Sequence, residues 1–373
     1  MCFDNLADKI SVDSLPWERL ADRILDYSLA LQLGENFLVS MTSIESYPLA
    51  AALVAGAVRR GAHPQIIMRP SEIDDLIRQV GTDEQAARSL SMELFGMNWA
   101  DVYVDLRSLI PPVIRATASD YDRRAALLQS ARGDVSTARW SQTRWCIVRV
   151  PTSDYAAYLG RPVDALFDDF FRGSVDDDGW RQWSDLAARL EDSRAVRIMT
   201  DDTDLTFSVA GRKWVLFDGK NNLPDGEIAT APLEHTATGY IEFPDALVFS
   251  GRRIKGLRME FEYGRVTKVD AGPNSGFVKA ILASDDGATR IGEFGIGLNS
   301  HIKDWTEDLF YDEKIVGTIH IALGRAYKEC GGTNLSAIHW DLVKDLRPSE
   351  SRKKGVVTID DTVIIDGTNL LFL

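Results

Sequence analysis

The stretch NFLVSMTSIESYPLAAALVAGAVRRGAHPQIIMR (Asn36–Arg69) decides the fold of the first half of the chain. It begins with the short apolar run NFLVSM and ends with a second one, HPQIIMR. The segment between them, Ser46–Gly61, has the spacing of a helix that Gly61 can end in a left-handed conformation. A strand, a helix and a strand at this spacing predict a βαβ unit, and hence parallel strand pairing.

The same alternation of helix and strand signals continues along the chain. Helical spacing recurs at Thr82–Phe95 and Ser119–Arg132, and strand-like apolar runs recur at Asp101–Arg107 and Arg144–Val150. We therefore predict an α/β domain with a mostly parallel sheet over residues 1–194.

The pattern changes after residue 195. Period-two alternation broken by glycine-containing turns runs through Thr238–Ala271, which predicts antiparallel strands. Leu205–Gly219 has the pattern of a hairpin that turns at Ala210–Gly211. We therefore predict an α+β domain with antiparallel strands over residues 195–373, and we expect it to carry the metal site argued for below.

Composition and charge restrict the possible partners. The 373 residues carry a net charge of −14, which argues against nucleic acid or an anionic membrane, because phosphate binding needs clustered Lys and Arg. No window approaches the ~18 apolar residues that a membrane span requires. The N-terminus lacks the features of a signal peptide, and three cysteines without a CxxC pair do not indicate a disulfide framework. A cytoplasmic location is therefore expected.

Histidines and acidic residues gather in the second half of the sequence. In the strand-like IHWDL, His339 and Asp341 share one face, because residues i and i+2 of a strand do so. His320 alternates with apolar neighbours in TIHIAL, and Glu293 lies among the glycines of RIGEFGIG, where another backbone can approach closely. This donor set suits Zn, Mn, Co or Fe better than Ca. A lone His-x-Asp pair is also common among ordinary hydrogen-bonded residues, so the residues alone leave a metal site and a structural role open.

Three groups of motifs, in sequence order, resemble those of the aminopeptidase T family of metallo-aminopeptidases, which includes the staphylococcal aminopeptidase S. NLPDGEIATAP (Asn222–Pro232) is similar to the family's N-x-P-x-G-E-v-x-T-x-P segment, and IGEFGIGLN (Ile291–Asn299) is similar to its G-E-l-g-i-G segment. LFYDEKIVGTIHIALGRAY, GGTN and SAIHWDLV, all within Leu309–Val343, follow the family order F-D-E-K-x-x-G-T-x-H-x-A-L-G-x-x-Y and then G-x-N-x-S-x-x-H-x-D. The resemblance runs through most of the chain.

The resemblance implies a divalent-metal site. In the family, the equivalents of five residues bind a pair of ions, and the equivalent of Tyr327 lies beside them. The five are Glu227, Glu293, His320, His339 and Asp341. Three carboxylates and two imidazoles are too many for one tetrahedral catalytic zinc. They suit two ions, or one ion of higher coordination number with spare acids as bases, so one or two ions of Zn, Mn or Co are expected. The resemblance also implies a homodimer.

The expected roles follow from the chemistry of such a site. Glu227 or Glu293 bridges the ions or takes a proton from a metal-activated water. Tyr327 donates a hydrogen bond to the negative charge that develops in the transition state. Arg325 pairs with a substrate carboxylate or forms a structural salt bridge.

Two positions depart from the family pattern. Ala229 stands where the family usually carries a bulky aromatic residue, and it either enlarges the substrate pocket or changes only the core packing. His301 is also unusual for the family, and it either contacts substrate or is an ordinary loop histidine.

Two enzyme functions fit these residues. We expect an aminopeptidase that removes N-terminal residues from small peptides. The alternative is an aminohydrolase that deaminates an activated aromatic amine such as 5-nitroanthranilate and releases ammonia, and the departures at Ala229 and His301 favour it. A ring dioxygenase of the 2,5-dihydroxypyridine type shares the fold but has histidine at the position of Glu293, and a non-catalytic metal-binding protein would lack a ligand, so both rank lower.

Overall fold

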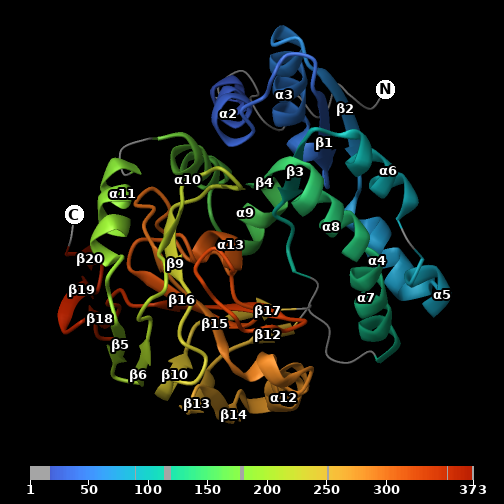
Figure 1. Cartoon of the computed structure of the whole chain (residues 1–373). Coiled ribbons are helices and arrows are strands. Elements are labelled where there is room, and N and C mark those ends of the chain that lie inside the picture. Colours follow the sequence, from blue (N-terminus) through green and yellow to red (C-terminus); the bar gives the residue numbers. More distant parts are fainter. Residues whose placement is uncertain are drawn as a thin grey trace. The chain divides into compact units, whose positions relative to one another are not determined.

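The computed structural model describes residues 17–88, 90–112, 119–176, 180–249, 252–350 and 352–371. The described residues form two compact units (Figure 1). Among the described residues, the first unit contains those within 17–111, 119–175 and 219–224, and the second contains 112, 176 and those within 180–218 and 225–371. The helix α11 (Trp180–Leu190) thus groups with the second unit, ahead of residue 195. A domain boundary at residues 194 and 195 stays a prediction.

The first unit is built on a five-stranded parallel sheet with the order β2-β1-β3-β4-β8. Its strands are β1 (Asn36–Met41), β2 (His63–Met68), β3 (Val102–Ser108), β4 (Arg144–Val150) and β8 (Asn222–Leu223). β1 and β2 pair in parallel and are joined by α3 (Tyr47–Arg59), after which Gly61 has a φ of +75°. The predicted βαβ unit and the left-handed end of its helix are therefore confirmed.

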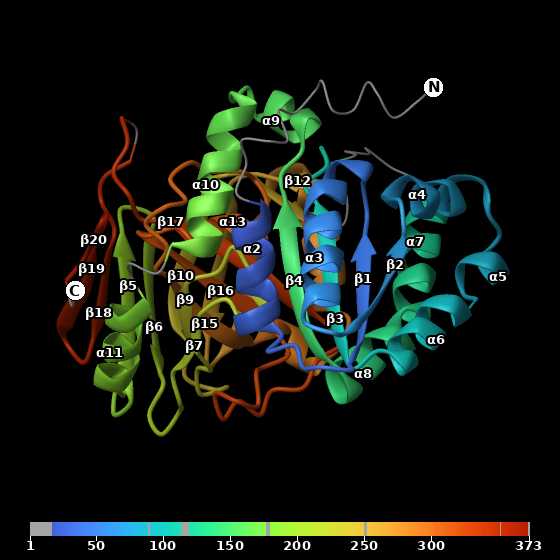
Figure 2. The same ribbon diagram turned by 90° about the horizontal axis from the view of Figure 1, so that it is seen from above.

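Helices cover both faces of this sheet. The connection from β1 to β2 runs in one direction along the sheet, and the connections from β2 to β3 and from β3 to β4 run in the opposite direction. Because such crossovers are right-handed, the helices of the first connection and those of the other two cover opposite faces. Figure 2 shows α2 and α3 together over one face. The helices of this unit are α2 (Trp17–Arg23), η2 (Ile24–Ser28), η3 (Ile44–Ser46), α3, α4 (Ser71–Val80), α5 (Asp83–Ala86), α6 (Ser91–Trp99), α7 (Ser119–Ala131), α8 (Gly133–Gln142), α9 (Ser153–Leu159) and α10 (Val163–Val175).

The prediction of one helix over Thr82–Phe95 is wrong. The structure has two helices there, because α5 ends at Ala86 and α6 begins at Ser91. Within α6, a side chain at Gly96 would approach Leu38 of β1 and Ile67 of β2 to 3.2 and 3.1 Å, so the helix packs tightly on these strands. Tertiary packing of this kind sets the course of a helix and overrides local propensity.

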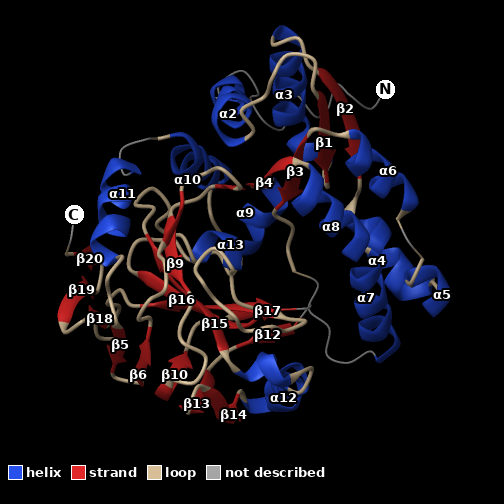
Figure 3. Ribbon diagram, viewed as in Figure 1, coloured by secondary structure: helices blue, strands red, loops and turns tan. Residues whose placement is uncertain are grey.

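Strands dominate the second unit, as Figure 3 shows. An eight-stranded antiparallel sheet has the order β14-β13-β10-β6-β5-β18-β19-β20, and a five-stranded antiparallel sheet, the site sheet, has the order β17-β16-β15-β9-β7. The strands are β5 (Ala195–Thr200), β6 (Thr203–Ser208), β7 (Val215–Phe217), β9 (Glu227–Thr230), β10 (Thr238–Phe243), β11 (Leu247–Phe249), β12 (Arg252–Ile254), β13 (Leu257–Glu262), β14 (Arg265–Asp270), β15 (Ile291–Gly297), β16 (Thr318–Gly324), β17 (His339–Asp345), β18 (Val356–Ile359), β19 (Thr362–Asp366) and β20 (Asn369–Leu370). The helices are α11, η4 (Gly272–Asn274), α12 (Ser275–Leu282), η5 (Asp286–Thr289) and α13 (Leu309–Asp312). The predicted fold class, an α/β part with a parallel sheet followed by a part with antiparallel strands, is confirmed.

The hairpin predicted within Leu205–Gly219 is wrong. β6 pairs with β5 and β10 in the eight-stranded sheet, whereas β7 pairs with β9 in the site sheet. Val209 and Trp214 are both buried in the core that the two sheets share. The segment therefore crosses from one sheet to the other, and the burial of its apolar residues determines this course.

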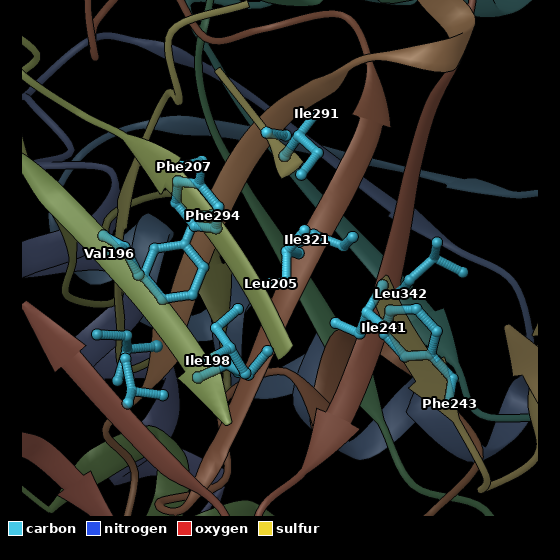
Figure 4. Close-up of a cluster of buried hydrophobic side chains, with 14 of the residues drawn as sticks. Val196, Ile198, Leu205, Phe207, Ile241, Phe243, Ile291, Phe294, Ile321 and Leu342 are labelled. Carbon is cyan, nitrogen blue, oxygen red and sulfur yellow. The ribbon is translucent and has the colours of Figure 1, made fainter. Parts of the chain in front are cut away.

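The core of the second unit lies between the two sheets (Figure 4). Phe207 of β6 and Phe294 of β15 meet there with ring centroids 5.2 Å apart. Ile321 of β16 and Leu342 of β17 join the same core. Since successive side chains of a strand point to opposite faces, the residues next to these in sequence lie on the other face of the site sheet.

Two further findings bear on the sequence-based expectations. Cys146 and Cys330 are buried free thiols. In the part of the chain that the structure describes, no helix is both long enough and apolar enough to cross a membrane.

Candidate metal centre

All five predicted metal ligands lie on the face of the site sheet that is turned away from the core. Each alternates with core residues in its strand: Ile228 follows Glu227, Phe294 follows Glu293, and Trp340 separates His339 from Asp341. The strand pairing of β9, β15, β16 and β17 brings these positions together from separate parts of the sequence.

A β-bulge places Glu293 on this face. Ile291 pairs with Leu323 and Glu293 pairs with Ala322, so Gly292 is an extra residue in β15. In a regular strand without a bulge, Ile291 and Glu293 would point to the same side, but Ile291 is part of the core. The bulge therefore turns the Glu293 carboxylate to the opposite face, a role that bulges often have next to active sites.

Three of the ligands form a first triad, which consists of Glu293, His339 and Asp341. Their ligand atoms all lie within 4.8 Å of one another. His339 Nε2 is 3.1 Å from Glu293 Oε2 and 3.4 Å from Asp341 Oδ1. His339 Nδ1 lies 2.8 Å from the carbonyl oxygen of Arg325, to which its N–H donates, and this turns Nε2 toward the two carboxylates.

A second triad consists of Glu227, Glu313 and His320, whose ligand atoms also lie within 4.8 Å of one another. His320 Nε2 stands between the triads, 3.6 Å from Glu227 Oε2 and 3.6 Å from Glu293 Oε1. The fully buried Lys314 joins this side, with its Nζ 2.5 Å from Glu227 Oε1 and 2.9 Å from Glu313 Oε1.

Glycine makes room for His320. A Cβ atom at Gly295, the residue opposite His320 in the strand pairing, would lie 2.0 Å from Cε1 of the imidazole. No side chain can occupy that position while the ring stays where it is. The glycines of IGEFGIG therefore serve the close approach that the sequence predicts for this segment.

The environment shifts the pKa values of these groups in different directions in the metal-free protein. Burial raises the pKa of Glu227 to about 8, although Lys314 opposes the shift. Burial acts the same way on Glu293, but His320 and His339 outweigh it and hold the Glu293 pKa below its ordinary value. Burial would lower the pKa of His320, yet the surrounding carboxylates, Glu293 first, raise it to about 9. Burial likewise raises the pKa of Asp341, but His339 more than compensates and the value falls to about 2.

Tyr327 lies beside the first triad. Its ring centroid is 5.1 Å from that of His339, and Phe217 packs against it at 6.0 Å. Burial first, and then the negative charge of the nearby carboxylates, raises the Tyr327 pKa well above its ordinary value. The phenol therefore keeps its proton near neutral pH and can donate a hydrogen bond.

The other predicted site residues have different positions. Ala229 is fully buried on the site face, where it pairs with Gly295. Arg325 is exposed, and among the described residues its guanidinium forms no ion pair, so the structural salt bridge considered above is not found there. His301 does not belong to either triad: it lines a cavity of about 630 Å³ together with Trp183, Ser300 and Asn369.

Sequence reasoning did not identify Glu313 and Lys314 as site residues. Both follow α13, which has only four residues, so neither lies on a strand whose periodicity could assign it a face. Their signal was nevertheless present, because they are the Glu-Lys of the F-D-E-K motif.

The residues present fit one or more divalent cations. Glu227 Oε2 and His320 Nδ1 are buried and have no hydrogen-bond partner within the described ranges, which is costly unless something else satisfies the cluster. Carboxylate and imidazole are suitable ligands for Zn, Mn and Co.

Comparisons with known proteins agree with the fold and with a metal-dependent enzyme. The sequence pattern of the family described as thermophilic metalloprotease (M29) matches residues 16–356. The chain is 24% identical over 360 residues to aminopeptidase 2 of Geobacillus stearothermophilus, covering 83% of this chain and 84% of that protein. It is 33% identical over 110 residues to aminopeptidase T of Thermus aquaticus, covering 29% of this chain and 27% of that protein. The solved structure of wild-type AmpT from Thermus thermophilus has the same fold, with a TM-score of 0.76 and 21% identity over 94% of this chain and 97% of that one.

Proposed function

Because the chain belongs to the thermophilic metalloprotease (M29) family, we propose that it is a metal-dependent aminopeptidase that removes N-terminal residues from small peptides. The observation that carries this proposal is the gathering of two acid-histidine triads on one face of the site sheet. Bound divalent metal would supply an activated water and polarise the scissile carbonyl. The proposed ligands are Glu227, Glu293, His320, His339 and Asp341.

The protein's own residues would divide the remaining tasks. Glu293 touches both His320 and His339, and its low pKa keeps it ionised, so it would accept a proton from the attacking water. Tyr327, which keeps its proton, would donate a hydrogen bond to the oxygen that becomes negative in the transition state. The carbonyl of Arg325 holds the imidazole of His339 in one tautomer and orientation.

The charge of the site supports a substrate with a free α-amine. Four carboxylates, two of them in each triad, gather here and would attract the ammonium group of a peptide N-terminus. Arg325, which is exposed and without an ion-pair partner among the described residues, is proposed to pair with the carboxylate of a short peptide. The small Ala229 would leave room beside His320, and His301 stays a candidate for substrate contact only at the separate cavity.

The test compares two substrate classes on one metal-loaded preparation. Amino-acid nitroanilides report aminopeptidase activity, and nitro-substituted anthranilates report aromatic amine hydrolysis. Release of nitroaniline that stops on chelation and returns with metal is the expected result. None of the relatives above is an aromatic-amine hydrolase by name, so the aminohydrolase is an outcome of this test and not a second proposal. Ammonia released from the anthranilates alone would overturn the aminopeptidase.

The homodimer and the cytoplasmic location stay predictions from the family resemblance and from the cysteine content. Size-exclusion chromatography with light scattering tests the first, and cell fractionation tests the second.

A further inference from the structure

The two triads differ in their relation to positive charge. Lys314 Nζ lies 2.5 Å from Glu227 Oε1, 2.9 Å from Glu313 Oε1 and 3.4 Å from Asp225 Oδ1. The second triad thus already shares its carboxylates with a protein cation. By contrast, no Lys or Arg among the described residues forms an ion pair with Glu293 or Asp341 of the first triad.

Lys314 is fixed in its position. Its backbone N–H donates to the carbonyl of Tyr311 at 3.1 Å, and its own carbonyl accepts from the N–H of Asn299 at 2.8 Å. Its side chain is completely buried, with Nζ 5.7 Å from the ring centroid of Phe310. A buried ammonium is strongly stabilised by staying next to its carboxylates, so it cannot simply turn into solvent when a metal arrives.

The second triad nevertheless keeps free ligand atoms. Glu227 Oε2 is buried and accepts no hydrogen bond from any described residue, although Oε1 of the same carboxylate is paired with Lys314. His320 Nε2 lies 3.6 Å from this free oxygen. A divalent ion could therefore bind here, but close to a like charge in surroundings of low dielectric constant, where repulsion is strong.

We propose that Lys314 is a positioning residue that makes the metal centre unequal. The first triad binds one divalent ion tightly, and the second triad binds another ion more weakly, because its carboxylates are shared with the Lys314 ammonium. The inference rests on the metal-dependent function proposed above, but it concerns the binding of ions and not turnover.

The experiment titrates the metal-stripped full chain with Co²⁺. Calorimetry and the visible absorption of the bound ion both monitor the binding. The expected result for the unchanged chain is two sites whose Kd values differ at least tenfold. In Lys314→Met, the Kd of the weaker site should fall at least tenfold, while that of the tighter site stays within about threefold.

Lys344→Met is the matched control. Lys344 is also fully buried, on β17, but its Nζ binds Asp202 Oδ1 at 2.8 Å and the carbonyl of Glu242 at 2.6 Å, on the other side of the site sheet. Both Kd values should stay unchanged in this variant. Two equal sites in the unchanged chain, or a weaker site that does not tighten in a folded Lys314→Met, would overturn the proposal.

A second variant decides the matter if Lys314→Met does not fold, as judged by circular dichroism. Glu313→Gln should lose the weaker ion and keep the tighter one, and loss of the tighter ion instead would also overturn the proposal. The outcomes separate this inference from the proposed function. Two unequal sites without any peptide hydrolysis would contradict only the aminopeptidase, whereas a chain that binds no Co²⁺ would contradict both.

Discussion

Glu293 and His339 meet across a strand to which neither belongs. Their Oε2 and Nε2 atoms are 3.1 Å apart, although β15 and β17 are separated by β16 in the site sheet. The residue of β16 that lies between the two flanking strands at this level is Ala322, which pairs with Glu293 on one side and with Asp341 on the other. The first triad therefore depends on a small side chain at its centre.

Ala322→Val should separate the two flanking strands' side chains and lower the affinity of the first triad for Co²⁺ more than tenfold. The valine methyl groups would occupy the space through which Glu293 and His339 approach each other. Calorimetric titration of the metal-stripped protein measures the effect. Ala195→Val, at an exposed strand position of β5, is the control and should leave the affinity unchanged. An unchanged Kd in the Ala322 variant would contradict this account.

Glu293→Gln should abolish turnover without unfolding the protein. The amide keeps the shape of the side chain but cannot accept a proton, a loss that typically lowers the rate by about 10²–10⁴-fold. Hydrolysis of an amino-acid nitroanilide gives the rate, and far-UV circular dichroism checks the fold. Turnover at the unchanged rate in this variant would remove Glu293 from the proposed chemistry.

Metal binding should release protons, and its apparent affinity should fall as the pH is lowered. Burial opposes the charged form, but the carboxylates outweigh it and raise the pKa of His320 to about 9 and the pKa of His339 well above its ordinary value. Both imidazoles are therefore positively charged near neutral pH in the metal-free protein. Ligation requires the neutral imidazole, hence each bound ion displaces protons. Calorimetric titrations at pH 7.5 in two buffers of different ionisation enthalpy measure the number released. Identical heats in the two buffers would contradict the prediction.

Gly295→Ala should weaken metal binding more than it weakens the fold. The new Cβ would lie 2.0 Å from Cε1 of His320 and force the imidazole to move. We expect a loss of at least tenfold in Co²⁺ affinity. Gly276→Ala in α12, where a Cβ meets no atom within 4 Å, is the control, and it should be neutral or stabilise the protein by up to ~1 kcal/mol. Equal metal affinities in the two variants would count against a steric role for Gly295.

Asp105→Asn should destabilise the protein by roughly 3–5 kcal/mol, the usual effect of removing one partner from a buried ion pair. In the first unit, the buried Asp105 carboxylate accepts from Arg107 Nε at 2.8 Å and from Arg69 at 3.2 Å. Urea unfolding at pH 7 measures the change. Asp204→Asn, which breaks an exposed pair with Arg197, should cost less than about 0.5 kcal/mol.

The stabilisation by Asp105 should depend on pH. Burial opposes ionisation of Asp105, but Arg107 and Arg69 outweigh it and lower the pKa from 3.8 to about 2. The stabilisation is therefore fully present above pH 3.8 and disappears as the pH falls through 2. The difference in unfolding free energy between the unchanged chain and Asp105→Asn should be constant from pH 7 to pH 5 and shrink below pH 4. A difference that grows on acidification would contradict the assignment.

The parts of the fold that follow local periodicity could be predicted from the sequence. The βαβ unit at Asn36–Arg69 was predicted because two apolar strands and the helix between them each show their own spacing. β8 could not be predicted in the same way: it has only two residues, and the pairing of Leu223 with Val148 is what places it in the first sheet. The course of Leu205–Gly219 was likewise decided by which sheet buries Trp214, and the local pattern does not carry that information.

The same distinction holds at the metal centre. Strand periodicity assigned His339 and Asp341 to one face, and the family motifs supplied Glu227 and Glu293. Lys314 was missed because its position depends on the short α13 and on the backbone bonds that follow it, and neither leaves a repeating pattern in the sequence.

The alternation along β16 limits how this strand can change its length. His320 faces the ligands while Ile319 and Ile321 face the core, so one inserted residue would exchange the two sets and put an imidazole among phenylalanines. An insertion of two residues restores the alternation, although it shifts the level of the strand. Insertional mutagenesis of β16 should therefore recover folded protein from two-residue insertions more often than from single ones. The length of this strand can change only by an even number of residues.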